Sequence, residues 1–116
     1  MFWFRRDLRI EDNHGFYRAL QGENKVIPIF IFDSNILDKL PKKDARVEFI
    51  LSALSKIDIA MKSNQCSLGI YHGTPEVFLK KYSKNGLLIR LYVTKIMSHM
   101  LQSEIKKFRY YLTKME

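Results

Sequence analysis

The chain has 116 residues, of which 47% are hydrophobic and 28% charged, a composition that is typical of one globular domain and excludes a disordered segment. No apolar run reaches the roughly 20 residues of a membrane span, no signal-peptide pattern precedes the first apolar run, and the single cysteine excludes an internal disulfide, so a cytoplasmic protein is expected. The net charge of +8 suits a polyanionic partner such as DNA, but ordinary solvated lysines explain it equally well.

Strands and helices are predicted to alternate along the chain, because apolar runs are separated by turn residues and by segments of helical apolar period. The expected strands are residues 1–5, 25–32, 67–72 and 87–93. The expected helices are residues 13–21, 44–62 and 74–83. This alternation predicts an α/β fold of Rossmann-like type, a three-layer sandwich whose parallel sheet of about four strands carries helices on both faces.

Local signals refine the ends and faces of these elements. Asp12 or Asn13 can cap the first helix, and Thr74 followed by Pro75 is a strong helix start. Pro28 inside the second strand indicates a bulge or a locally open edge. The long helix is expected to bury one apolar stripe, namely Val47, Ile50, Leu51, Leu54, Ile57 and Met61.

The most informative stretch follows the first strand. Arg5, Arg6, Asp7 and Arg9 fall within five positions, directly before a helix start. In open α/β sheets, ligands bind at the carboxyl ends of strands, where helix N-termini and loop side chains meet. A ligand site is therefore expected at this turn. The glycines form no dinucleotide-binding fingerprint after the first strand.

The order Trp-Phe-Arg-Arg-Asp-Leu-Arg-Ile-Glu-Asp-Asn at residues 3–13 closely resembles the opening motif of the DNA photolyase/cryptochrome family. Further similar landmarks are residues 14–16, 26–33, 44–50, 73–76 and 91–92. The resemblance covers about residues 1–95 and implies the N-terminal α/β domain of that family, which has five strands when complete. It implies descent from a light-dependent DNA repair lyase (a deoxyribodipyrimidine photolyase) or from a cryptochrome-type blue-light photoreceptor.

This resemblance also implies an antenna-chromophore cleft, for methenyltetrahydrofolate or for a deazaflavin or flavin. Carried onto this sequence, the expected contacts are Arg5, Arg6, Asp7, Asp33 and Arg46. The alternative for the arginines and Asp7 is an internal salt-bridge network that secures the turn. In the family, FAD and damaged DNA bind a helical domain without a counterpart in this sequence, so no catalytic residue is expected and the chain alone should be inactive.

The likeness stops abruptly after Lys95. Members of the family continue with Asp-Tyr-Glu-Pro-Tyr-Ala, whereas this chain continues with Ile-Met-Ser-His-Met-Leu. Synonymous codons read from one base earlier restore Asp-Tyr-Glu-Pro-Tyr-Ala-Thr-Ile-Arg-Asp, so residues 96–116 are expected to be an out-of-frame tail. The alternative is a natural short domain with its own C-terminal helix. A sheet without its last strand and partner domain should expose apolar surface and self-associate.

The remaining residues offer no further chemistry. Trp3 is expected in the core, and Cys66 is expected to pack as a small apolar residue. The three histidines are scattered without the spacing of metal ligands. A free-standing nucleotide-binding α/β module is another interpretation, but it needs a phosphate-binding glycine loop late in the chain, where the sequence has none.

Overall fold

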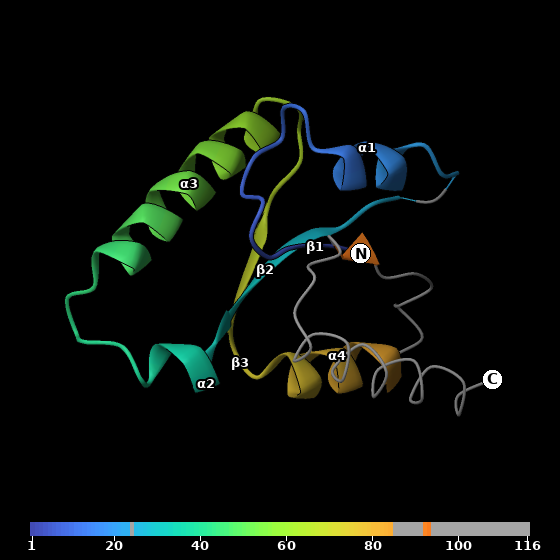
Figure 1. Cartoon of the computed structure of the whole chain (residues 1–116). Coiled ribbons are helices and arrows are strands. Elements are labelled where there is room, and N and C mark those ends of the chain that lie inside the picture. The colour runs from blue at the N-terminus through green and yellow to red at the C-terminus, as the bar shows by residue number, and fades with distance from the viewer. Residues whose placement is uncertain (24, 85–91, 94–116) are drawn as a thin grey trace.

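The computed structural model describes residues 1–23, 25–84 and 92–93. They form a four-stranded parallel sheet of order β3-β2-β1-β4 with helices on both faces, which confirms the predicted fold class (Figure 1). The strands are β1 (Phe2–Phe4), β2 (Pro28–Asp33), β3 (Gly69–Gly73) and β4 (Tyr92–Val93). The helices are α1 (His14–Leu20), α2 (Ser34–Leu37), α3 (Ala45–Lys62) and α4 (Pro75–Lys84).

The two central strands divide the core into two layers, because successive side chains of a strand point to opposite faces of the sheet. The layer that joins the sheet to α1 and α3 consists of Phe2, Phe4, Phe16, Ala19, Phe30, Leu54, Ile57, Met61 and Leu68. The layer that joins the sheet to α4 consists of Trp3, Ile29, Ile31, Phe78 and Leu79. Since both faces of β1 and β2 are covered, these strands read as continuous apolar runs rather than as alternating ones.

Strand β2 begins later than the sequence predicts. Pro28 is its first residue and pairs in register with Phe2 of β1. On its other side β2 pairs with β3 only from Ile29 onward, so Pro28 has no partner in β3, which agrees with the predicted locally open edge; neither register contains a bulge. A proline has no N–H to donate, and the first position of a strand tolerates that loss. The ladder instead starts one residue earlier, where the N–H of Phe2 donates to the carbonyl of Ile27 at 2.9 Å.

Helix α3 has the predicted bounds, with Asp44 as its N-cap, but its buried stripe is shorter than predicted. Leu54, Ile57 and Met61 are buried, whereas Leu51 keeps 51% of its surface exposed. All fully buried residues of α3 lie in its second half, and Figure 1 shows the first half extending away from the sheet. Helical periodicity predicts which face is apolar, but it does not show where a helix leaves the sheet.

The connections around β3 and α4 follow the predicted pattern with small shifts. Thr74 caps the N-terminus of α4, since its hydroxyl oxygen accepts from the N–H of Val77 at 3.4 Å. Cys66 lies exposed in the connection before β3, so its predicted burial was wrong. Of the predicted fourth strand, residues 92–93 pair with β1, whereas residues 87–91 and the whole 96–116 segment lie outside the described residues.

Candidate functional site

The carboxyl ends of β1 and β2 lie at the same edge of the sheet, because the two strands are parallel and in register. Strands β2 and β3 lie on one side of β1, and β4 lies on the other. The direction of chain connection therefore reverses between β1 and β4, and such a switch point is where open α/β sheets bind ligands. Arg5 and Arg6 are the first two residues after β1.

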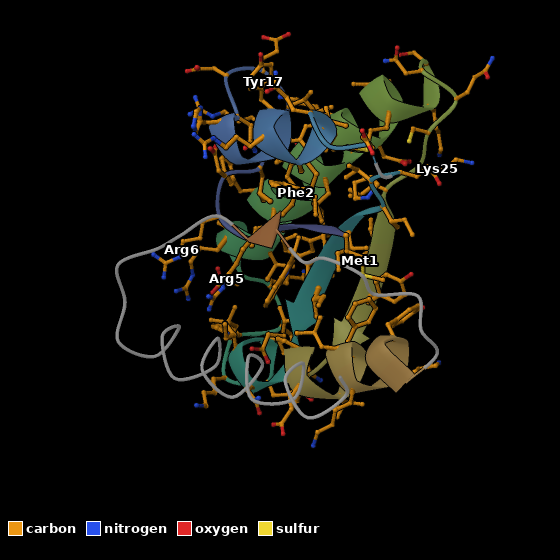
Figure 2. All side chains as sticks on the ribbon, turned by 90° about the vertical axis from the view of Figure 1, so that its right-hand side faces the viewer. Met1, Phe2, Arg5, Arg6, Tyr17 and Lys25 are labelled. Carbon is orange, nitrogen blue, oxygen red and sulfur yellow. The ribbon has the colours of Figure 1, made fainter. Side chains whose placement is uncertain are left out.

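Figure 2 shows the side chains of Arg5 and Arg6 projecting from the end of β1 toward the same side of the molecule. The guanidinium carbon of Arg5 lies 5.6 Å from the ring centroid of Trp3, within the range of a cation–π contact. Trp3 is only 6% exposed, which confirms its predicted place in the core. The buried indole therefore restricts the orientation of the Arg5 guanidinium, while Arg6 is exposed.

The turn that follows is braced by its own charged and amide groups. Arg9 Nε donates to Asp7 Oδ1 at 2.7 Å, and Arg9 Nη1 lies 3.9 Å from Asp12 Oδ2. Asn13 Oδ1 caps α1 by accepting from the N–H of Phe16 at 3.0 Å, while Asn13 Nδ2 donates to the carbonyl of Arg9 at 3.0 Å. Arg9 thus belongs to an internal ion pair, as the salt-bridge alternative expects, whereas Arg6 faces solvent.

Asn13 has a larger structural role in this turn than the sequence predicts. It was predicted only as one of two possible caps, yet its side chain is buried and bonds to both sides of the turn. A weaker contact from its Nδ2 reaches the carbonyl of Asp7 at 3.4 Å. The signal that could have found it is an amide between a charged turn and a helix start, because an amide can accept from the helix and donate back to the turn, whereas the carboxylate of Asp12 can only accept.

Asp33 and Arg46 lie farther along the same sequence of strand ends and helix starts. Asp33 is the last residue of β2 and caps α2, with Oδ1 accepting from the N–H of Asn35 at 2.9 Å. Arg46 forms a bidentate pair with the α3 cap, donating from Nε to Asp44 Oδ1 at 2.9 Å and from Nη2 to Asp44 Oδ2 at 2.7 Å. The structure thus places three of the five predicted residues in one turn and the other two at separate helix starts.

The Arg46 side chain, together with its backbone N–H, lowers the pKa of the Asp44 carboxyl from 3.8 to about 2. Hydrogen bonds to the ionised carboxylate favour its charged form, which accounts for the direction of the shift. In return, the same hydrogen bonds raise the pKa of the Arg46 guanidinium. The charge of Arg46 is therefore already partly compensated before any ligand arrives.

Charge is balanced at this edge of the sheet. Residues 5–12 contain three arginines and three carboxylates, and residues 33–48 contain four basic and four acidic residues. The net charge of +8 therefore arises elsewhere in the chain. A long polyanion would require a cluster of uncompensated positive charge, so this edge suits a small ligand that contacts individual side chains.

Other kinds of site are missing from the parts of the chain that the structure covers. Among these residues no three His, Cys, Asp or Glu side chains gather closely enough to hold a metal ion. None of the helices in the described ranges is long and apolar enough to cross a membrane.

Comparison with known proteins gives a consistent answer. A sequence model of the family described as DNA photolyase matches residues 1–114. An uncharacterised 31.6 kDa protein of Synechococcus sp. (strain PCC 6716) is 35% identical over 75 residues, which are 65% of this chain and 26% of that protein. A cryptochrome DASH of Solanum lycopersicum is 30% identical over 88 residues, or 71% of this chain and 15% of the relative. A deoxyribodipyrimidine photo-lyase of Synechococcus sp. (strain ATCC 27144) is 30% identical over 76 residues, which are 66% of this chain and 16% of that relative. The chain thus spans about a quarter or less of these relatives.

Proposed function

This chain belongs to the DNA photolyase family, and we propose that it forms the N-terminal antenna domain of a deoxyribodipyrimidine photolyase, an enzyme of light-dependent DNA repair. The observation that carries this proposal is the position of Arg5 and Arg6 directly after β1, at the switch point of the sheet. The opening motif that the family shares thus coincides with the place where an α/β sheet of this topology binds ligands.

The ligand that fits this turn is an anionic heteroaromatic chromophore, of the methenyltetrahydrofolate or deazaflavin and flavin classes. A guanidinium group is planar, stacks on rings and donates two parallel hydrogen bonds to a carboxylate or phosphate. Arg5, backed by the Trp3 indole, offers such a plane, and the exposed Arg6 offers donors. When bound, a chromophore of this kind would absorb near-ultraviolet or blue light and supply excitation to a flavin.

The other predicted contacts take narrower roles in this proposal. Asp7 is held by Arg9 and keeps the turn in shape, and Asp33 similarly shapes the start of α2. Arg46 uses Nε and one Nη2 hydrogen for Asp44, so its Nη1 group remains to meet the anionic tail of a chromophore. Replacement of Asp44 should therefore leave the Arg46 guanidinium without a fixed orientation and weaken, rather than strengthen, its contact with the chromophore.

The repair reaction itself is not assigned to this chain. The photolyase and cryptochrome relatives are more than six times longer than the segment matched here, which is 15–16% of their length. We propose that flavin and damaged DNA bind outside the segment that this chain matches, and that the 116-residue chain alone does not split pyrimidine dimers. Illumination of ultraviolet-damaged oligothymidine with the purified chain should leave the dimers intact.

An absorbance scan of the purified chain tests the antenna role. After incubation with methenyltetrahydrofolate or a flavin and gel filtration, a near-ultraviolet or blue band should co-elute with the protein. The variant Arg6→Ala should lose most of that band. The control Arg18→Ala, which removes an exposed arginine on α1 and away from the turn, should retain it. Equal retention by both variants, or no band with any chromophore, would reject the proposed site.

A cryptochrome-type photoreceptor domain is the second candidate, since a cryptochrome DASH is among the relatives. Both candidates require the same antenna domain. They differ in whether the complete gene product repairs damaged DNA in light, so a repair assay with that product distinguishes them.

A further inference from the structure

We propose that two copies of this chain associate through strand β3, which pairs antiparallel with β3 of the second copy across a two-fold axis. The two sheets would then form one continuous sheet. This inference does not depend on the antenna role, because it rests on an edge of the sheet rather than on the carboxyl ends of its strands.

Among the strands of residues 1–23, 25–84 and 92–93, β3 is an outer strand of the sheet. It pairs with β2 along all five of its residues, Gly69 to Gly73, and the sheet order places no strand on its other side (Figure 2). Within the described ranges, no further backbone hydrogen bond joins these residues to another element. An outer strand of this kind presents a row of N–H and C=O groups that can pair with another chain.

This edge lacks the features that usually prevent such pairing. Natural edge strands carry charged side chains, prolines or bulges that block a second chain. Residues 63–75 contain no Lys, Arg, Asp or Glu, and β3 itself pairs with β2 without a bulge. Ile70 is 48% exposed and His72 is also exposed, although both point to a face that is elsewhere covered by helices.

The net charge of the chain narrows the choice of surface for a second copy. Two chains of charge +8 repel each other over most of their surfaces, and this repulsion is smallest where a surface segment carries no charge. The uncharged stretch 63–75 flanks and includes β3. A second copy at this edge therefore meets no like charge from residues 63–75.

The segment is self-complementary, as a two-fold interface requires. Antiparallel pairing centred on Tyr71 places Gly69 opposite Gly73 and Ile70 opposite His72, with Tyr71 facing Tyr71 of the other copy. Register with β2 puts Ile70 on the side of Phe30, toward the α1 and α3 layer, and Tyr71 on the side of α4. This register places no Lys, Arg, Asp or Glu side chains opposite each other, and like charges directly opposite would destabilise the pairing.

The expected dimer is weak, because strands of five residues with few flanking contacts bury less than the roughly 1,200 Å² of a standard interface. Dissociation constants on the order of micromolar or weaker are expected for such contacts. Sedimentation velocity of the 116-residue chain over a hundredfold concentration range should therefore show a monomer–dimer equilibrium.

A charge at the edge tests the proposed surface. Ile70→Lys and, independently, His72→Glu should give monomers at every concentration, with circular dichroism showing that each variant is folded. The matched control is Ile59→Lys, which places the same charge on the outer face of α3, where Ile59 is 66% exposed, and should leave the dimer unchanged. A monomeric parent chain, or a dimer disrupted by Ile59→Lys and not by Ile70→Lys, would overturn the proposal.

The register is tested separately by cross-linking. In a Cys66→Ser background, Tyr71→Cys should form an intermolecular disulfide on mild oxidation, because directly opposed residues of antiparallel strands have Cα atoms about 4.5–5.5 Å apart. Failure of the oxidised variant to cross-link while it still dimerises would refute pairing centred on Tyr71.

Discussion

Replacement of Asn13 by alanine should destabilise the whole domain, because this one side chain connects the charged turn after β1 to the first turn of α1. Asn13 is 3% exposed and makes 3.0 Å hydrogen bonds to the Phe16 N–H and the Arg9 carbonyl. Loss of a helix cap costs about 1 kcal/mol, and a buried backbone group left without a partner costs about 1–3 kcal/mol. Because the bond to Arg9 is only partly buried, the expected loss in the free energy of unfolding is about 2–3 kcal/mol.

Urea denaturation followed by tryptophan fluorescence measures this loss, since Trp3 is the one tryptophan and lies in the core. With a slope of about 1.5 kcal/mol per molar urea, the midpoint of unfolding should fall by ~1.3–2 M. Asn13→Ser keeps an oxygen that caps the helix but loses the donor to Arg9, so it should show roughly half the loss.

The control is Asn64→Ala, which removes a 3.0 Å side-chain hydrogen bond to the Ala60 carbonyl at an exposed position. Its effect should be within about 0.5 kcal/mol. If Asn13→Ala were as mild as Asn64→Ala, the argument that burial of the Asn13 amide stabilises the turn would be refuted.

Three further predictions address the core, the pH dependence and the C-terminal segment. Leu54→Ala, at a side chain that is 1% exposed, should lower the free energy of unfolding by about 3 kcal/mol, whereas Leu51→Ala, at one that is 51% exposed, should cost less than about 1 kcal/mol; thermal unfolding compares the two. The pKa of Asp44 is about 2 in the folded chain against an ordinary 3.8, so its stabilising effect is present above pH 4 and is lost as the pH falls toward 2. In acid unfolding, Asp44→Asn should therefore be less stable than the parent chain above pH 4, and this difference in stability should disappear by about pH 2. A difference that does not depend on pH would contradict the lowered pKa of Asp44. For residues 96–116, the nucleotide sequence around codon 95 should encode Asp-Tyr-Glu-Pro-Tyr-Ala in the shifted frame, and codons that do not would reject an out-of-frame origin.

The element types and their order could be predicted because they depend on local signals. Asp44 in front of an apolar helical period, and Thr74 in front of Pro75, are signals that the structure confirms as helix starts. The errors concern properties that no local pattern carries. Leu51 fits the helical period of α3 but is exposed at the flank of the buried stripe, although its neighbour Ile50 packs against the core. Cys66 lies in an exposed connection.

The candidate site shows the same division between local and tertiary information. The sequence places Arg5, Arg6 and Asp7 at a strand end, and the structure agrees with that placement. Which arginine binds Asp7 depends on the path of the turn, and the structure selects Arg9. The guanidinium of Arg46 donates two hydrogen bonds to Asp44, only two residues away. The family resemblance does not show this pairing.

The brevity of β1 has a consequence for how the domain melts. Phe2 and Phe4 belong to one layer of the core and Trp3 belongs to the other. All three residues pair with β2, and Phe2 and Trp3 also pair with β4. Neither layer can therefore come apart without the other, so unfolding should be a single cooperative event rather than a loss of one face at a time. Deletion of the few N-terminal residues that form β1 should accordingly unfold the whole domain.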